Sequence, residues 1–381
     1  MNVKTFVNSS LLSVSSGVNF FGYYNLSPIN ERGDILFLKV EKEEVRGSLH
    51  EPASIMLKQT DGAIQKIAET NSWNWQQGCM VQWLPLNCKY LIFNDYDEAN
   101  DRYISKIINS KGVIIKTYNN PIYNVSKCGS YALTLDYSRL AQMRPDYGYF
   151  NKKEFILLNE REDGIWRVDL DSGNVFLIIS LDELKRLSWS PTMEEAKHKV
   201  NHIDINPSGK RFMFLHRWKG SHGRFMRLLT ANSNGEEIRI INGDIMTSHS
   251  CWLDDNHILS YCNFNGSNGY FKFIDDDNNQ AFLMANMPNR DGHPSLSPDG
   301  KWIVTDTYPD VSRFSELYLY NIKNAETILL GQFFQPLRYN KEKRIDLHPK
   351  WGNDSRSIFF ESGHTKQRRL YLFSINIKEL S

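Results

Sequence analysis

The sequence has little cysteine and no CxxC pair. Five cysteines in 381 residues, an odd and scattered set, are typical of reduced thiols rather than of a disulfide framework. The chain also lacks an excess of charge of one sign, because 45 Lys and Arg face 44 Asp and Glu. Without a general positive field, no nucleic-acid partner is expected, and an anionic ligand would have to be held by local groups.

Long apolar runs are absent as well. The segment 1–25 is rich in Ser and Asn, where a signal peptide would need a continuous apolar stretch. No segment is apolar over the length that a membrane helix requires. We therefore expect a cytoplasmic protein without a membrane partner.

What the sequence does contain is the composition of a folded protein with many aromatic residues. Hydrophobic residues make up 41% of the chain and charged residues 23%, which argues against long disordered segments. Aromatic residues reach 13%. They favour pleated, half-buried sheet surfaces and also line sugar-binding clefts, although core packing is their more common use.

A degenerate repeat indicates the fold class. Its clearest copies are NPSGKRFMF at 206–214 and SPDGKWIVT at 297–305, in which a turn with Pro and Gly precedes an alternating apolar strand. Copies of this unit begin at residues 27, 83, 125, 206, 252, 297 and 351. Because propeller blades repeat at about this spacing, we predict an all-β protein, a seven-bladed β-propeller. It would occupy residues 1–381 as one domain, with blades beginning near residue 21.

The interval from 125 to 206 is longer than the others. Within it, Leu181, Leu184 and Leu187 recur at helical spacing. We predict a helical insertion in the third blade, at about 137–200. We also expect a strand from residues 1–20 to close the ring by pairing with the last blade.

Polar motifs lie just before and after the predicted inner strands, where a propeller gathers functional loops around its channel. They are WNWQQG at 73–78, SRLAQMRPDYGY at 138–149, FLHRW at 214–218, SHSCW at 248–252, DGHPS at 291–295 and DLHPKW at 346–351. In this order they resemble the motifs of the propeller polysaccharide lyases, the family that includes oligogalacturonate lyase and the ulvan lyases. The resemblance runs from about residue 20 to the end. The turn SPDGKW alone is less specific, because TolB-like and peptidase-associated propellers share it.

The resemblance implies a divalent metal ion, zinc or manganese, held by histidines from successive blades. By motif, the ligands fall on His249, His293 and His348, with Asp291 where relatives place another ligand. The residue types suit this role, because Asp291 and His293, two positions apart on an extended segment, project to the same side. Taken singly, each histidine would more often be a hydrogen-bonded structural residue. The metal would either take part in chemistry or hold the blades together.

The resemblance also implies β-elimination from a uronic acid. This reaction needs a group that neutralises the carboxylate, a base for the C5 proton and an acid for the leaving oxygen O4. Arg217 is the predicted carboxylate clamp, since a guanidinium binds a carboxylate through two hydrogen bonds; an interblade salt bridge would explain it equally well. His202 is the first choice for the base and His216 the second.

Further residues would complete the binding of the substrate, which we expect to be a uronate-containing oligosaccharide or polysaccharide. Tyr147, Tyr149 and Tyr261 are candidates for the acid or for stacking on sugar. Arg139 and Arg144 would extend the sites for anionic sugars. Gln77 would contact hydroxyl groups, unless it caps a buried inner strand.

Two other interpretations stay open. The chain has no histidine between His50 and His198, whereas ulvan lyase relatives use histidines in their earlier blades. A catalytically inactive glycan-binding or scaffold propeller, for instance one serving polysaccharide assembly, is therefore the alternative to a lyase that acts on short imported oligosaccharides. The propeller half of a peptidase is disfavoured, because neither a G-x-S-x-G motif nor an α/β domain follows.

Overall fold

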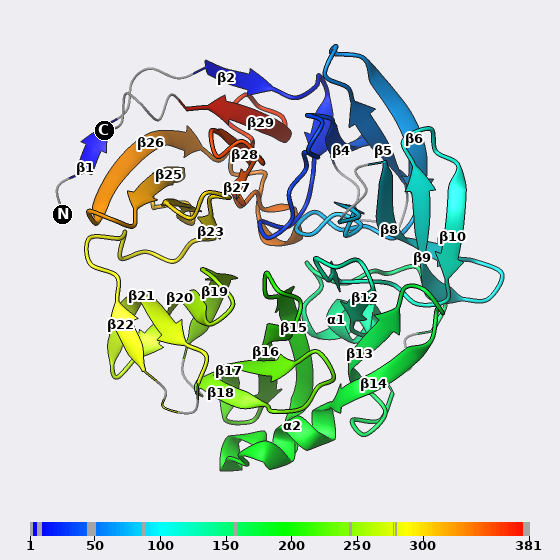
Figure 1. The fold of residues 1–381 in the computed structure, drawn as a ribbon, viewed down its shortest axis with the longest axis vertical. Helices are drawn as coiled ribbons and strands as arrows, with labels where there is room; N and C mark the ends of the chain where they lie inside the picture. Colours follow the sequence, from blue (N-terminus) through cyan, green and yellow to red (C-terminus); the bar gives the residue numbers. More distant parts are fainter. Residues whose placement is uncertain are drawn as a thin grey trace.

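Seven sheets stand around a central axis in chain order (Figure 1). The computed structural model describes residues 3–5, 10–43, 51–85, 89–154, 158–243, 246–276, 278 and 280–375. Residues 86–88 of the second repeat and 155–157 of the predicted insertion lie outside the described residues. The predicted seven-bladed β-propeller is confirmed.

The first four blades are antiparallel meanders of consecutive strands. The first contains β3 (Val18–Phe20), β4 (Ile35–Val40), β5 (Ala53–Lys58) and β6 (Ile64–Thr70). The second contains β7 (Gln82–Trp83), β8 (Tyr90–Asp97), β9 (Arg102–Asn109) and β10 (Ile114–Tyr118). The third contains β11 (Asn124–Val125), β12 (Tyr131–Thr134), β13 (Gly164–Asp169) and β14 (Val175–Ser180). The fourth contains β15 (Lys197–Ile205), β16 (Arg211–Gly220), β17 (Gly223–Asn232) and β18 (Arg239–Asn242).

The last three blades follow the same plan and take up the start of the chain. The fifth contains β19 (Thr247–Trp252), β20 (His257–Phe264), β21 (Ser267–Ile274) and β22 (Ala281–Leu283). The sixth contains β23 (Ser295–Leu296), β24 (Trp302–Asp306), β25 (Phe314–Asn321), β26 (Glu326–Phe334) and, at its edge, β1 (Val3–Thr5). The seventh contains β27 (Lys350–Trp351), β28 (Ser357–Ser362), β29 (Arg369–Ser374) and β2 (Ser10–Ser13).

The N-terminal segment closes the ring. β2 pairs antiparallel with β29, with Leu11 opposite Phe373, so the expected closing strand from residues 1–20 is present. β1 pairs in parallel with β26 as a fifth strand of the sixth blade, which the repeat pattern did not predict. The start of the chain therefore belongs to two neighbouring blades.

The repeat turns are fixed by side chains that accept backbone hydrogen bonds. In the fourth blade, Asn206 Oδ1 accepts from the backbone N–H of Arg211, and Gly209 adopts the left-handed φ of +71° that favours glycine. In the sixth blade, the Ser297 hydroxyl accepts from the backbone N–H of Trp302. The turn residues read from the sequence therefore have the same physical role in both blades.

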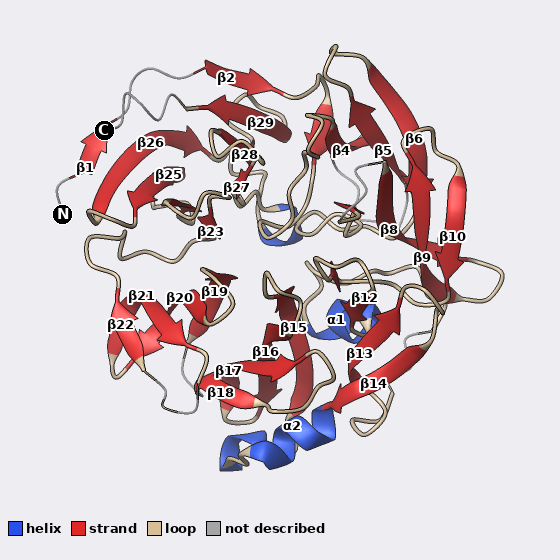
Figure 2. Cartoon of the chain, in the orientation of Figure 1, coloured by secondary structure: helices blue, strands red, loops and turns tan. Residues whose placement is uncertain are grey.

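Two short α-helices accompany the third blade (Figure 2). α1 (Tyr137–Met143) separates β12 from β13 and is capped by Asp136. α2 (Leu181–Leu187) follows β14 and begins with a capping box. The predicted excursion over 137–200 is thus interrupted, because β13 and β14 belong to the blade itself. The described residues also form two short 3₁₀ helices, η2 (Pro191–Met193) and η3 (Lys341–Lys343).

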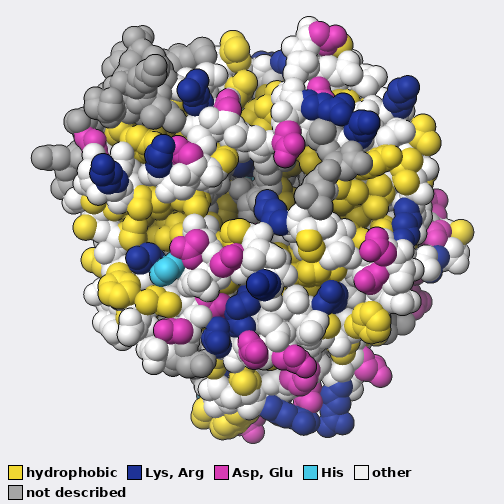
Figure 3. Space-filling view, in the orientation of Figure 1, with side chains coloured by type: hydrophobic (Ala, Val, Ile, Leu, Met, Phe, Trp, Pro, Cys, Tyr) yellow, Lys and Arg dark blue, Asp and Glu magenta, His cyan; other side chains and the backbone are white. Residues whose placement is uncertain are grey.

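The surface carries charges of both signs. On the face drawn in Figure 3, basic and acidic side chains are interspersed, in keeping with the near-zero net charge of the sequence. Across the described ranges, no helix has the length and apolar character that a bilayer span demands.

A buried ion pair joins the seventh blade to the loops of the first and second. Arg368 and Glu361 are 2% and 0% exposed, and the Arg368 guanidinium donates to Glu361 Oε2 over 3.1 Å. Glu361 Oε1 accepts from the backbone N–H groups of Phe21 and Gly22. Arg368 also donates to the backbone oxygen of Trp75. Each charge therefore depends on the other at the junction where the ring closes.

We expect Glu361→Gln to lower the free energy of unfolding by about 3–5 kcal/mol, because it leaves the Arg368 guanidinium buried without its counter-charge. Urea unfolding followed by tryptophan fluorescence measures the change. Glu69→Gln is the matched control, since it removes only an exposed pair with Lys66 and should cost about 0–1 kcal/mol. Equal, small losses in both variants would contradict the expectation.

Candidate metal and substrate-binding site

Three histidines meet where the fifth, sixth and seventh blades approach the channel. His249 lies on β19, whereas His293 and His348 lie in the segments that precede β23 and β27. The ring centroids of His249 and His293 are 3.9 Å apart, and those of His293 and His348 are 4.4 Å apart. All three residues are buried. The structure therefore brings together the three histidines that the motifs singled out.

One carboxylate, Asp306 at the end of β24, positions two of these histidines. Its Oδ1 accepts from the backbone N–H of His293 over 2.6 Å and lies 2.9 Å from His293 Nδ1. Its Oδ2 accepts from the backbone N–H of His348 over 3.2 Å. Because Nδ1 of His293 is occupied in this way, Nε2 is the nitrogen left for a ligand.

The ligand atoms that face one another belong to His293, Asp346 and His348. One potential ligand atom from each lies within 4.8 Å of the others, and all three residues are buried. Nε2 of His293, Nε2 of His348 and Oδ1 of Asp346 are buried without a hydrogen-bond partner in the described part of the chain. Leaving such atoms unpaired is costly. Two imidazoles and a carboxylate suit a divalent ion such as Zn²⁺ or Mn²⁺, so the residues fit a metal.

Asp346 was missed from the sequence, although a signal for it was present. It stands two positions before His348, the same spacing that identified Asp291 and His293. Asp291 takes another role: its carboxylate accepts from the Ser248 hydroxyl over 2.6 Å and lies 3.3 Å from His249 Nδ1. The structure therefore places Asp291 behind His249 rather than within the cluster of mutually close ligand atoms.

His202 lies next to this cluster and is paired with Tyr23. The Tyr23 hydroxyl is 2.5 Å from His202 Nδ1, and the Tyr23 ring packs edge-on against His348 with centroids 5.2 Å apart. His202 has a left-handed φ of +54° and sits in a register shift of β15 between Asn201 and Asp204. Burial, followed by the charge of Arg217, lowers the pKa of His202 well below its ordinary value. The imidazole is therefore neutral near pH 7.

A group of cations lies on the same side of the fourth blade. Arg217 stands opposite Lys199 in the β15–β16 ladder, and its buried Nε has no partner among the described residues. Burial, followed by Arg144, lowers the pKa of Arg217. Arg144 itself lies 4.6 Å from the centre of the Tyr147 ring and pairs with Asp146. These cations offer binding for an anionic group, and the Asp146 carboxylate, which pairs with Arg144, offsets part of their charge.

Tyr147 and Arg344 complete this surface. Tyr147 is buried and contacts His202 and Tyr23 edge-on, with ring centroids 5.7 and 5.9 Å away. Arg344, which the sequence reading passed over, forms an ion pair with Asp146 and donates to the Tyr147 hydroxyl over 3.4 Å. It lies two positions before Asp346 and four before His348, directly upstream of the DLHPKW motif.

The structure places two predicted catalytic residues away from the site. His216 is fully buried on the opposite side of β16 from Arg217, where its Nε2 lies 2.9 Å from His198 Nδ1 and its Nδ1 accepts from Arg227. Neighbouring residues of a strand face opposite sides, so His216 and Arg217 cannot share the channel. Tyr149 is also fully buried: its ring stacks on Tyr137 with centroids 4.3 Å apart, and its hydroxyl accepts from Asn94.

Three predicted substrate contacts are structural or peripheral instead. Arg139 is buried, pairs with Asp163 and donates to the backbone oxygen of Leu158. Gln77 is 1% exposed and donates to the Tyr123 hydroxyl over 2.7 Å. Tyr261 packs edge-on against Tyr270 in a hydrophobic cluster of the fifth blade. None of these three contacts the histidine cluster through an interaction found among the described residues.

We expect Asp306→Asn to weaken the binding of Mn²⁺ by about 10–100-fold, because an amide cannot accept both from His293 and from the backbone of His348. Calorimetric titration of chelator-treated protein with MnCl₂ measures this. Asp171→Asn, at an exposed position of the third blade, is the control and should retain the parent affinity. Unchanged affinity in Asp306→Asn would overturn the assigned role of this carboxylate.

The buried pair of His198 and His216 leads to a pH prediction. Burial lowers the pKa of His198 from 6.5 to about 4, so this ring stays neutral in the folded chain while the unfolded chain takes up a proton. The free energy of unfolding should therefore fall as the pH drops from about 6.5 towards 4. His198→Phe should make this decline shallower, whereas His222→Ala, at an exposed turn, should not. Urea unfolding between pH 4 and 7 measures both, and identical slopes would refute the prediction.

Comparison with known proteins gives information on the fold of the chain and not on its activity. No protein-family model matches the chain, and no curated protein matches it by sequence. Oligogalacturonate lyase from Vibrio parahaemolyticus superimposes with a TM-score of 0.67 at 13% identity, covering 98% of this chain and 95% of the lyase. An oligogalacturonate lyase in complex with manganese gives 0.65 at 15% identity over 100% of both chains. The β-propeller domain of the Trilobed protease from Pyrococcus furiosus gives 0.53 at 10% identity, covering 93% and 95%. At these identities the likeness shows the β-propeller fold alone, and the activity is a separate question.

Proposed function

We propose that the protein is a metal-containing lyase that cleaves uronic-acid-containing glycans by β-elimination. The observation that carries the proposal is the cluster of unpartnered, buried ligand atoms of His293, Asp346 and His348, which lies beside the Tyr23–His202 pair. The likeness to an oligogalacturonate lyase in complex with manganese supports both the metal and the class of substrate. Zn²⁺ and Mn²⁺ are the candidate ions.

The carboxylate of the substrate would be bound by Arg217. Its buried Nε has no partner among the residues described here, so the guanidinium can present two N–H groups to one carboxylate. Arg144 would hold the carboxylate of a neighbouring sugar. A divalent ion held by His293, Asp346 and His348 would supply further positive charge, which makes a proton next to a carboxylate more acidic.

The proton transfers would fall to His202 and Tyr147. His202 takes the proton from C5, the bond between C4 and O4 breaks, and a double bond forms between C4 and C5. The Tyr23 hydroxyl holds His202 Nδ1 and so orients the ring. Among the three tyrosines considered from the sequence, Tyr147 contacts His202, and its hydroxyl would donate the proton that O4 needs.

We expect Arg217→Lys to lower kcat/KM on a uronate oligosaccharide roughly a hundredfold, which corresponds to a loss of about 2–3 kcal/mol in transition-state stabilisation. Lysine keeps the positive charge but cannot form the bidentate contact with a carboxylate. The assay follows the ultraviolet absorbance of the unsaturated product at several metal concentrations. Arg224→Lys, an exposed arginine on the same blade, is the matched control and should leave the rate unchanged.

In the same assay, His202→Ala tests the role of His202 as the base independently of carboxylate binding by Arg217. It should abolish turnover while substrate still binds, because proton abstraction is lost and Arg217 is kept. Parent-like turnover in His202→Ala would show that another group is the base. If the parent protein binds uronate oligosaccharides but cleaves none of them, a catalytically inactive glycan-binding propeller is the correct interpretation.

A further inference from the structure

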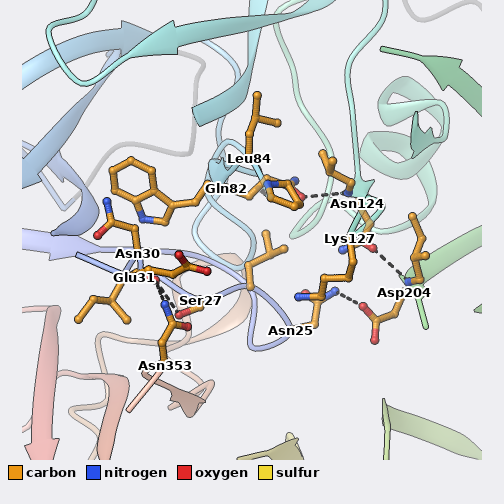
Figure 4. A pocket seen from close by; sticks show the side chains of 16 residues that line it. Asn25, Ser27, Asn30, Glu31, Gln82, Leu84, Asn124, Lys127, Asp204 and Asn353 are labelled. Carbon is orange, nitrogen blue, oxygen red and sulfur yellow. Dashed lines mark hydrogen bonds between the residues drawn. The ribbon is translucent and has the colours of Figure 1, made fainter. Parts of the chain in front are cut away.

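A second cavity lies beyond the Tyr23–His202 pair and contains none of the candidate metal ligands. It has a volume of about 360 Å³ and is lined by residues from the inner strands of the second, third and fourth blades and by the loop after β3. Figure 4 shows Asn25, Asn124 and Asp204 converging on it, with Leu84 on another side. The size falls in the range of small-molecule sites. We call it the amide pocket, defined by Asn25, Trp83, Leu84, Asn124 and Asp204.

The amide pocket is separated from the metal side of the channel. Among the described residues, the cavity that Tyr23 and His202 line together with Asn25 and Asp204 has a volume of about 10 Å³, which holds at most one water molecule. A ligand in the amide pocket would therefore not reach the histidine cluster.

Its polar atoms retain unused hydrogen-bonding capacity. Asp204 Oδ1 accepts from Asn25 Nδ2 over 3.0 Å, and no described residue donates to Asp204 Oδ2. Asn25 Oδ1 is buried without a partner. Asn124 Oδ1 accepts from the backbone N–H of Ile205, which leaves its amide N–H groups without an acceptor among the described residues. Carboxylate and amide oxygens therefore lie beside an amide donor, a combination that matches the donor and acceptor properties of neighbouring hydroxyl groups.

The other wall of the pocket is apolar. Trp83 is held in place because its indole N–H donates to the backbone oxygen of Pro28 over 3.0 Å, and Leu84 and Pro85 continue the same wall. Trp and aliphatic side chains pack against the C–H face of a ring whose edge carries hydroxyl groups.

We propose that the amide pocket binds a neutral sugar residue, with its hydroxyl groups on Asp204, Asn25 and Asn124 and its apolar face against Trp83 and Leu84. A cation is the poorer occupant, because burial raises the pKa of Asp204 to about 7, partly opposed by Asn25 and by Lys127 at the exposed rim. A carboxyl group that is partly protonated near neutral pH attracts a cation weakly but still bonds to hydroxyls. An anion is disfavoured because the acidic side chains of Asp204 and Glu31 line the pocket, against one basic side chain, Lys127.

The test is saturation-transfer NMR on the full chain with D-galactose, L-rhamnose and D-galacturonate as probes. We expect at least one neutral sugar to bind more tightly than galacturonate. Asp204→Leu should weaken that binding at least tenfold. Leu84→Trp, which fills part of the cavity with a larger side chain, should do the same and guards against a folding defect in Asp204→Leu. His293→Ala should leave neutral-sugar binding unchanged.

The outcomes are distinguishable from those of the proposed lyase. No binding of either neutral sugar by the parent protein would overturn the amide pocket as a sugar site, whatever the result of the elimination assay. So would neutral-sugar binding that survives both Asp204→Leu and Leu84→Trp. Binding that favours galacturonate and disappears in His293→Ala belongs to the metal side, and that outcome also contradicts this proposal.

Discussion

The candidate site depends on one buried carboxylate. Asp306 is 1% exposed and accepts hydrogen bonds from the backbone of His293 and of His348, so it holds together segments from two neighbouring blades. The approach is close enough that a Cβ on Gly292 would lie 1.8 Å from the backbone oxygen of Asp306. A glycine is therefore required there, and the motif DGHPS contains it for a steric reason. Asp306 thus fixes both the backbone and the imidazole of His293, and the backbone of His348.

The alternation of strand side chains decides which residues reach the channel. On β16, Arg217 and His216 point to opposite sides, and Arg217 lies with the cations of the channel. His216 contacts His198 and Arg227, and Arg227 in turn donates to a backbone oxygen of α2. The register shift in β15 changes this alternation, and His202 beside it adopts a left-handed φ. Bulges of this kind commonly redirect a side chain next to a functional site, which is how His202 comes to face Tyr23.

Charge is balanced over the whole chain and unbalanced at the channel. The sequence carries a formal net charge of +1, yet Arg144, Arg217 and Lys199 lie together with Asp146 as their nearby acid. Burying these cations costs solvation free energy, and the depressed pKa of Arg217 reflects that cost. An anionic ligand would recover part of it. In the same way, a bound cation would provide partners for the unpaired ligand atoms of His293, Asp346 and His348.

The sequence by itself was enough to predict the number of blades and their turns, because these features follow from local turn chemistry and from period-two alternation. The strand from residues 1–20 that closes the ring was expected, but no sequence feature established it, and the structure decided it. The sequence also singled out His249, His293 and His348, whose rings the structure brings close together, although the mutually close ligand atoms belong to His293, Asp346 and His348. It could not rank the remaining polar residues: Tyr23, Asp306 and Asp346 were missed, and His216, Tyr149 and Arg139 were assigned to a site that they do not reach. Only the tertiary structure decided these cases. The direction of a side chain depends on strand register, on a one-residue irregularity in β15, and on contacts such as that of Tyr23 with His202, 179 positions apart.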